Sequence, residues 1–144
     1  MRLTTFTDFG LRALMQIASD PDRAWSTTEI ADEFGISRQH LTKAMAALAR
    51  AGFLKTRRGG GGGAMLAQPA HNILIGDVVR VLEKDQSLVE CFRAEGNACY
   101  ITPVCKLKGF LGAAEAAFLT ALDSYTLAEC ALLAVPDFIE TDAS

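Results

Sequence analysis

Three cysteines lie close together in the stretch ECFRAEGNACYITPVCKLK, residues 90–108. Seven residues separate Cys91 from Cys99, and five separate Cys99 from Cys105. Thiolates are ligands of zinc and of iron–sulfur clusters, so this grouping raises the question of a metal centre. The helices predicted on either side of the stretch have to position it.

Three interpretations of the cysteines compete. Cysteine packs as a small hydrophobe, but the residues between these cysteines include Arg93, Glu95 and Asn97, which is not an apolar setting. Structural zinc takes four ligands, often with two cysteines two to four residues apart, and neither gap is that short. Iron–sulfur clusters accept wider spacings, and the residues alone leave zinc and a cluster both open. The fourth cysteine, Cys130, lies among alanine and leucine on a predicted helix, which favours packing.

The composition indicates one folded domain, and the start of the chain indicates that its thiols stay reduced. The chain has 144 residues, of which 50% are hydrophobic and 22% charged. It has no apolar run near the roughly 18 residues that span a bilayer. Asp8 and Arg12 interrupt the first apolar stretch and no small-residue cleavage site follows, so we expect no signal peptide. A disulfide framework is therefore not expected.

The first half of the chain predicts a helix-turn-helix. Apolar spacing predicts a helix over residues 3–19. Ser26 and Glu29 have the spacing of a capping box, which predicts a second helix that ends at Gly35. Ser37 is expected to cap a third helix, which runs to about residue 50.

A glycine-rich segment follows that helix-turn-helix. FLKTR (residues 53–57) and AMLA (residues 64–67) can form two strands, and five glycines at 59–63 can form the turn between them. A P-loop would need Gly-Lys-Ser/Thr after the glycines, which is absent, and a flexible linker fits the flanking strands less well. The predicted fold class is mainly α: a winged helix-turn-helix with a small two-stranded β wing and a long dimerisation helix.

The second half predicts helices that flank the cysteines. An amphipathic helix is expected over residues 73–84, and a long helix with Thr102 as N-cap and Pro103 at its first position. Thr126 and Glu129 form a second capping box. The long helix is apolar over a wider surface than one small domain needs, which predicts a homodimer. We expect a DNA-binding region at residues 1–70, the cluster loop and dimerisation helices at 71–135, and a frayed tail at 136–144.

Charge is segregated along the chain. Residues 1–70 carry nine Lys and Arg against six Asp and Glu, a net +3, whereas residues 71–144 carry five against eleven, a net −6. A solvated helix face is the simpler interpretation, but the long stretch from Phe34 to Gly76 has no acid, which favours a surface that faces phosphate. Its six cations are Arg38, Lys43, Arg50, Lys55, Arg57 and Arg58.

The motifs together resemble a known family. MRLTTFTDFGLRALM, the capped helix-turn-helix, RGGGGGAMLAQP, IGDVVRVLE and CYITPVCKLKGFL are similar to the NsrR group of iron–sulfur transcription repressors, in the winged-helix family shared with IscR. The resemblance extends from Met1 to about Ala131. It implies a cytoplasmic homodimer, not an enzyme, that represses transcription and loses DNA affinity when nitric oxide attacks its cluster. A 4Fe–4S cluster is favoured, with 2Fe–2S as the alternative.

The resemblance also assigns ligands. Cys91, Cys99 and Cys105 correspond to the cluster cysteines. The IscR-like branch has a histidine where this chain has Lys108, whereas the NsrR-like branch implies Asp8, donated by the partner subunit. The simpler role of Asp8 is an i,i+4 ion pair with Arg12, and alternation between the two would make a switch. The first cysteine gap is longer than in some relatives, and glycines replace the polar residue usual in the wing.

The predicted DNA contacts come from the third helix, the wing and, at Thr28, the second helix. Arg and Lys can donate to guanine and Gln can pair with adenine, although Arg38 and Lys43 can also contact phosphate only. Two copies would read a palindromic double-stranded operator. The alternatives are a regulator that senses iron or cluster supply, and a zinc-bound interaction module. The residues assigned to DNA are Thr28, Ser37, Arg38, Gln39, His40, Thr42, Lys43, Arg57, Arg58 and Gly59.

Overall fold

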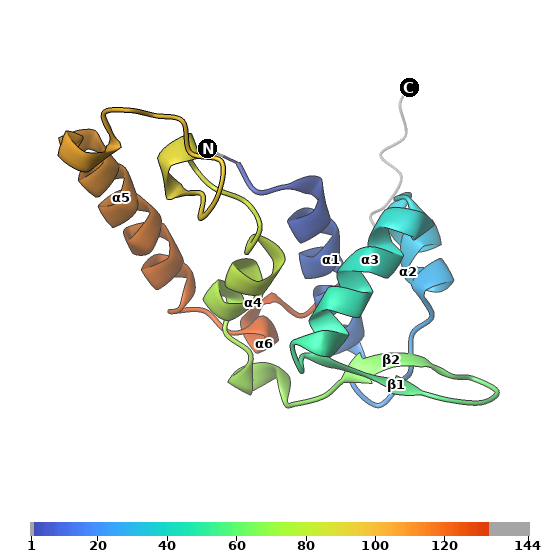
Figure 1. The fold of residues 1–144 in the computed structure, drawn as a ribbon. Coiled ribbons are helices and arrows are strands. Elements are labelled where there is room, and N and C mark those ends of the chain that lie inside the picture. Colours follow the sequence, from blue (N-terminus) through green and yellow to red (C-terminus); the bar gives the residue numbers. More distant parts are fainter. Residues whose placement is uncertain (1, 133–144) are drawn as a thin grey trace, which may run out of the picture.

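A computed structural model describes residues 2–132 of the chain, which fold into helices around a small hairpin (Figure 1). The α-helices and strands are α1 (Thr5–Ser19), α2 (Thr27–Phe34), α3 (Arg38–Arg50), β1 (Leu54–Arg57), β2 (Gly63–Leu66), α4 (Ile75–Leu82), α5 (Lys106–Leu122) and α6 (Leu127–Cys130). Three short 3₁₀ turns lie at Ala70–Asn72, Glu90–Phe92 and Thr102–Val104. The predicted fold class, a winged helix-turn-helix that is mainly α, is confirmed.

Local capping explains where the first helices begin. The Thr4 side chain caps α1 by accepting from the Thr7 N–H. The capping box of α2 is confirmed: Ser26 Oγ accepts from the Glu29 N–H, and the Glu29 carboxylate accepts from the Ser26 N–H at 2.8 Å. Gly35 ends α2 with φ 62°, a left-handed conformation that favours glycine, and this turns the chain into α3.

The wing is a hairpin with a third segment paired to it. β1 and β2 are antiparallel, with Leu54 opposite Leu66 and Arg57 opposite Gly63. The Trp25 N–H donates to the Ala64 carbonyl at 2.9 Å, and the Ala64 N–H donates back at 2.7 Å. This bridge fastens the base of the wing to the chain just before α2, so the hairpin does not rely on its own hydrogen bonds alone.

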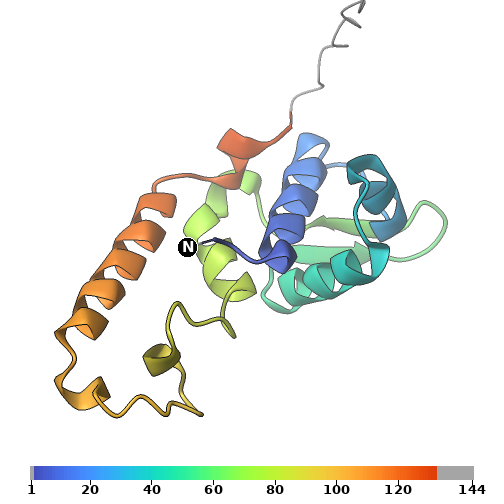
Figure 2. The ribbon, with the colours of Figure 1, turned by 90° about the horizontal axis from the view of Figure 1, so that it is seen from above.

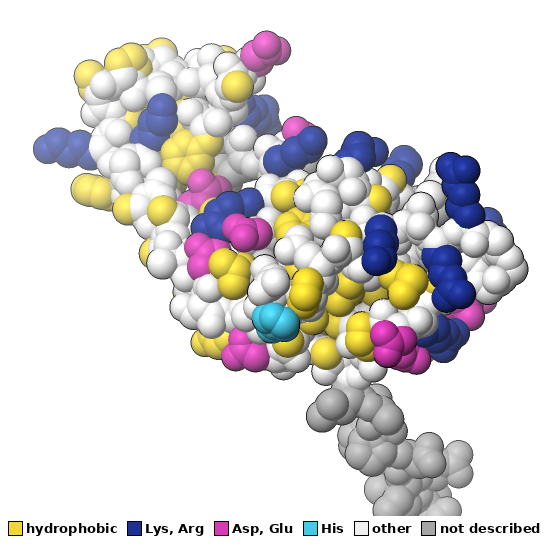
Figure 3. Space-filling model, turned by 90° about the horizontal axis from the view of Figure 1, so that it is seen from below, with side chains coloured by type: hydrophobic (Ala, Val, Ile, Leu, Met, Phe, Trp, Pro, Cys, Tyr) yellow, Lys and Arg dark blue, Asp and Glu magenta, His cyan; other side chains and the backbone are white. Residues whose placement is uncertain are grey.

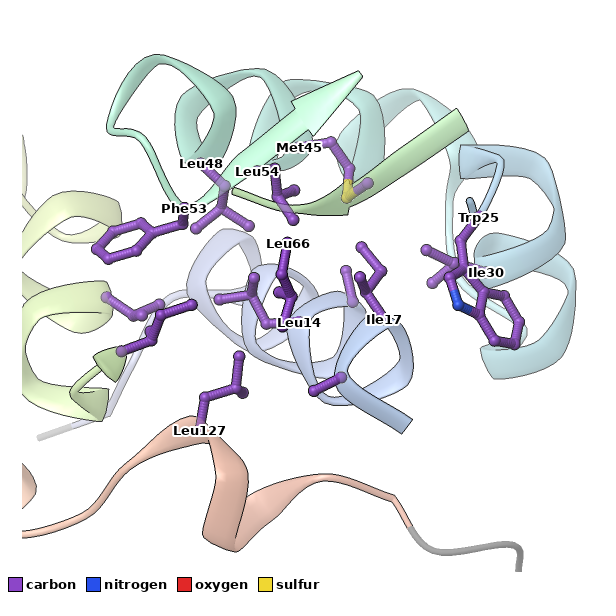
Figure 4. Close-up of a cluster of buried hydrophobic side chains, with 14 of the residues drawn as sticks. Leu14, Ile17, Trp25, Ile30, Met45, Leu48, Phe53, Leu54, Leu66 and Leu127 are labelled. Atoms are coloured by element: carbon purple, nitrogen blue, oxygen red, sulfur yellow. The ribbon is translucent and has the colours of Figure 1, made fainter. Parts of the chain in front are cut away.

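The core joins the helix-turn-helix to the second half of the chain. Leu14 and Ile17 of α1 are fully buried; Leu14 lies near Leu48 of α3 and Leu66 of β2, and Ile17 lies on the side of Met45 (Figure 4). Leu127 of α6 is also fully buried and closes the core from the other side. At roughly 1.5–3 kcal/mol for each fully buried aliphatic side chain, this cluster supplies the main stabilisation of the described fold.

Helix α5 stands apart from this core. It contacts α4, but none of its residues is buried, and it lies at the opposite end of the molecule from the hairpin (Figures 1 and 2). Between α5, α4 and the N-terminal segment is a hollow of about 450 Å³, lined in part by Leu3, Phe118 and Leu119. The large exposed hydrophobic residues of the described chain are Tyr100, Ile101, Val104, Leu107, Phe110 and Tyr125.

The predicted start of the long helix was wrong. α5 begins at Lys106, and Thr102 and Pro103 belong to a separate 3₁₀ turn. The Thr102 hydroxyl donates to the Cys99 carbonyl at 2.7 Å and accepts from the Asn97 amide at 3.1 Å. Since both contacts lie inside the loop, the hydroxyl does not cap a helix.

The C-terminal part of the described chain confirms one prediction and leaves others untested. The second capping box is present, because the Glu129 carboxylate accepts from the Thr126 N–H at 2.7 Å, although the helix it opens has only four residues. None of the described helices is long and apolar enough to cross a membrane. The division into regions 1–70 and 71–135 stays a prediction. The tail at 136–144, like residues 133–135, lies outside the described residues.

Candidate functional site

Helix α3 separates the residues predicted to read DNA from those that hold it to the core. Leu41, Ala44, Met45 and Leu48 are buried. The predicted contacts lie on the opposite face and are all exposed, namely Ser37, Arg38, Gln39, His40, Thr42 and Lys43. The helix therefore presents a continuous polar surface that begins at its N-terminal end, the geometry in which a recognition helix contacts base edges.

Two of these residues also have structural roles. Ser37 Oγ accepts from the His40 N–H at 3.3 Å and so caps α3. The Thr42 hydroxyl donates to the Arg38 carbonyl at 2.8 Å within the helix. Arg38, Gln39 and Lys43 are exposed and carry further N–H donors on this face.

The wing and the start of α2 flank this surface. Arg57, Arg58 and Gly59 are exposed at the end of the hairpin, and Thr28 is exposed in the first turn of α2. Seen from below, several Lys and Arg side chains gather over the hairpin end of the molecule (Figure 3). The segregated charge of the sequence thus becomes a localised basic surface.

Arg23 is a further cation beside this surface that the sequence analysis did not assign. With Arg57 it lines an open hollow between the wing and the start of α2. Its guanidinium carbon lies 3.7 Å from the centroid of the Trp25 ring, and Nη2 lies 2.8 Å from Glu29 Oε1. The available sequence signal was a basic residue two positions before a tryptophan and three before a capping box.

The same hollow contains the capping carboxylate of α2. Hydrogen bonds from the backbone and side chain of Ser26, and then the contact with Arg23, hold the pKa of Glu29 below its ordinary value. Glu29 is therefore an anion at neutral pH, and it orients Arg23 at the edge of the basic surface.

The cysteine loop lies between α4 and α5. Cys91 is in the 3₁₀ turn Glu90–Phe92, Cys99 precedes the next turn, and Cys105 directly precedes α5. All three are free thiols and partly buried, as is Cys130 in α6. The loop is held by its own polar contacts, including the Ala98 N–H donating to Glu90 Oε1 at 2.6 Å.

The three thiols do not converge in this structure. Within residues 2–132, no three His, Cys, Asp or Glu side chains are arranged to hold a metal ion. By type the donors fit an iron–sulfur cluster, since three free thiols lie in one loop. The ligand set Cys91, Cys99, Cys105 and Asp8 therefore stays a prediction.

Asp8 forms the predicted ion pair with Arg12. Asp8 Oδ2 lies 2.9 Å from Arg12 Nη2, and Arg12 Nε donates to Asp8 Oδ1 at 3.2 Å. The two side chains are 48% and 40% exposed, respectively, so the pair lies at the surface of the first turns of α1. A carboxylate with this exposure is accessible to a second molecule.

Comparison with known proteins agrees with the fold. Residues 3–131 match the family Rrf2, described as "Iron-dependent Transcriptional regulator". Among solved structures, T. potens IscR is 27% identical with a TM-score of 0.70, over 90% of this chain and 85% of that chain. CymR (YrzC), the global cysteine regulator of B. subtilis, is 27% identical with a TM-score of 0.70, over 91% of this chain and 96% of that chain.

An oxidized form of Staphylococcus aureus CymR is also similar. It is 26% identical with a TM-score of 0.69, over 94% of this chain and 100% of that chain. Because the family match extends over most of the chain, and because the fold is a winged helix, the chain belongs to the Rrf2 family of transcriptional regulators.

Proposed function

We propose that this protein is a homodimeric transcriptional repressor whose iron–sulfur cluster senses nitric oxide. The observation that carries the proposal is the loop between α4 and α5, which holds three free and partly buried thiols in a member of an iron-dependent regulator family. The three cysteines stand in a polar loop and not on an apolar stripe, and cluster ligation explains all three at once. A bound cluster supplies iron that reacts with nitric oxide.

The exposed face of α3 performs the DNA recognition. Arg38 and Gln39 lie in the first turn of α3, where side chains reach base edges of the major groove. Arg57 and Arg58 at the wing contact phosphates, which fixes the register of the helix on the duplex. Two subunits related by a two-fold axis read the two halves of a palindrome.

Helix α5 provides the subunit contact in this proposal. Leu107 is 58% exposed and Phe110 is 68% exposed, on a helix with no buried residue among those described. A second copy of the same helix covers such a face in a self-complementary way. The contact also brings the cysteine loop of one subunit within reach of the other subunit.

Asp8 has two partners available in this arrangement. Within its own subunit it pairs with Arg12. As the fourth ligand it would instead face the thiols of the partner subunit. An exposed i,i+4 pair contributes only about 0.3–0.5 kcal/mol, so Asp8 can exchange one partner for the other at low cost.

One observation favours a second candidate, a regulator that senses iron or cluster supply. The family is described as iron-dependent and IscR is among the similar structures, and neither fact specifies nitric oxide. This candidate uses the same cysteines and the same DNA surface. The zinc-bound interaction module, which would not bind DNA, has no support from a family of transcriptional regulators.

The cysteines provide the test. We expect Cys91→Ala, Cys99→Ala and Cys105→Ala each to abolish the visible absorbance of anaerobically purified protein and its specific DNA binding. Cys130→Ala, the matched control on α6, should retain both. Nitric oxide should release the parent protein from DNA in a gel shift, whereas release by iron chelation alone would favour the supply sensor. A zinc-bound colourless protein would refute the cluster.

A further inference from the structure

Glu83, at the C-terminal end of α4, contacts the N-terminal end of α1. A single carboxylate oxygen, Oε1, accepts from the Thr4 N–H at 2.8 Å and from the Thr4 hydroxyl at 2.7 Å. The same oxygen accepts from the Thr7 hydroxyl. The three donors stand 76 to 79 residues before Glu83 in the sequence, so the contact is tertiary and not part of either helix.

The contact fixes the first turn of α1. Thr4 is the N-cap of that helix, and its hydroxyl oxygen also accepts from the Thr7 N–H at 3.3 Å. Thr7 is fully buried although it is polar, and such a group is stable only with its hydrogen bonds made. Removal of the Glu83 carboxylate would leave the buried Thr7 hydroxyl without this acceptor.

The residue before Glu83 reinforces the same junction. Leu82 is 5% exposed and packs against Gly10, where a Cβ would lie only 2.6 Å from Leu82 Cδ1. α1 and α4 therefore approach closely at this point. Beyond Glu83 the chain continues directly into the segment that carries Cys91.

Asp8 follows Thr7 in α1, so the first turn of α1, which Glu83 contacts, is also the turn that carries Asp8. The Asp8 N–H donates to the Thr4 carbonyl at 3.0 Å, which places Asp8 in the hydrogen-bonded turn capped by Thr4. Nothing in the Asp8–Arg12 pair itself holds that turn against α4, since both residues lie on α1.

We infer that Glu83 is a positioning residue for Asp8: by holding the capped first turn of α1, it sets where the Asp8 carboxylate is presented to the partner subunit. The inference rests on the proposed function for the role of Asp8 as a ligand. The contact of Glu83 with α1 does not depend on a cluster. It joins the end of α4, which leads into the cysteine loop, to α1, which carries Asp8.

The charge state of Glu83 suits this role. Burial alone would raise the pKa of the carboxyl, but the hydrogen bonds from Thr7 and Thr4 outweigh it and hold the pKa below its ordinary value. Hydrogen bonds to a charged acceptor are about twice as strong as neutral ones. Because all three bonds use one oxygen, glutamine can reproduce the geometry without the charge.

The first measurement uses the apo protein and follows amide hydrogen exchange at Thr4, Thr7 and Asp8. We expect Glu83→Ala to accelerate exchange there by about tenfold or more. Glu83→Gln should have a smaller effect, and Thr7→Val should reproduce part of the loss at nearly constant volume. Asp85→Asn is the matched control, an exposed carboxylate two residues on, and should leave exchange unchanged. Unchanged exchange in Glu83→Ala would overturn the inference, whether or not a cluster is present.

The second measurement uses cluster-loaded protein. Visible circular dichroism should change in Glu83→Ala in the same direction as in Asp8→Ala, with absorbance per protein retained, and Glu83→Gln should restore much of the parent spectrum. A general loss of stability would lower the unfolding temperature but leave the cluster spectrum alone. Faster exchange with an unchanged spectrum would overturn the positioning role. Absence of a cluster from the parent protein itself would refute the proposed function, and the exchange result would still decide whether Glu83 holds α1.

Discussion

At the scale of single residues, Arg38 and Arg58 belong to different parts of the basic surface. Arg38 is exposed in the first turn of α3, whose opposite face is buried in the core. Arg58 is exposed at the wing, just beyond the paired strand β1. A residue on a recognition helix can read a base in the major groove, whereas we expect a cation on the wing to contact chiefly the phosphate backbone.

We therefore predict that Arg38→Ala relaxes base preference, with a loss of about 1–3 kcal/mol on specific DNA and a smaller loss on random DNA. Arg58→Ala should lower the affinity for specific and for random DNA by a similar factor. Fluorescence anisotropy with the two DNAs at constant salt measures the difference. Equal losses from Arg38→Ala on both sequences would show that Arg38 contacts phosphate only.

Asp8 is either a cluster ligand or only the ion-pair partner of Arg12, and substitution separates the two roles. If Asp8 is a cluster ligand, Asp8→Ala should remain coloured and dimeric, with a changed visible circular dichroism spectrum and weaker operator binding. If it only pairs with Arg12, the variant should lose about 0.5 kcal/mol of helix stability and keep the parent spectrum. Arg12→Ala is the matched control, because it removes the ion pair but not the carboxylate. An identical spectrum in Asp8→Ala would remove Asp8 from the ligand set.

At the scale of elements, α5 is the helix whose exposed apolar side chains lack cover in the single chain. Phe110 is 68% exposed, and the hollow behind α5 separates it from the N-terminal segment. Besides its contacts with α4, a helix with so little burial gains stability from contacts outside its own subunit.

Phe110→Glu should therefore disrupt the dimer, since it places a charge in the centre of an apolar contact. Sedimentation should show a shift from dimer to monomer at micromolar concentration, and cooperative binding to a palindrome should be lost. Asn72→Glu adds the same charge on an exposed 3₁₀ turn away from α5 and should remain dimeric. A dimeric Phe110→Glu would place the subunit contact elsewhere.

The elements also show how much of this structure could be predicted from the sequence. The capping boxes at Ser26 and Thr126 were predicted because their partners stand three residues apart. The start of α5 was missed because the Thr102 hydroxyl hydrogen-bonds within the loop, and helix propensity alone cannot predict that contact. The pairing of Trp25 with Ala64 was missed because it joins segments far apart in the sequence.

In the candidate site, too, features set by local spacing could be predicted and features set by tertiary contacts could not. The exposed face of α3 and the Asp8–Arg12 pair could be predicted, because both depend on helical spacing. Arg23 was not assigned, since its place beside Arg57 depends on how the wing packs on α2. The contacts of Glu83 with Thr4 and Thr7 depend on the tertiary meeting of α1 and α4, for which the sequence carries no local signal.

At the scale of the whole molecule, charge is divided between the two halves of the chain. The first 70 residues carry a net +3 and the rest a net −6. The acidic half repels DNA, so binding depends on a few cations gathered at the hairpin end (Figure 3).

DNA binding should therefore fall steeply with salt. If six to ten phosphates are contacted by the dimer, affinity drops by about 10³ to 10⁵ between about 50 mM and about 200 mM salt. Removing Arg58 from each subunit should lower the slope of log affinity against log salt by about two. A slope near zero would mean that the basic surface does not face phosphate.

In our proposal the chain is a dimer whose cysteine loops hold iron–sulfur clusters that react with nitric oxide. Native mass spectrometry of anaerobically purified protein, before and after stepwise addition of nitric oxide, tests all parts of it in one sample. We predict a dimer with one cluster per subunit, and a loss of cluster mass with iron-nitrosyl products as nitric oxide is added. A monomer, a dimer loaded with zinc, or a cluster whose mass is unchanged by nitric oxide would contradict it.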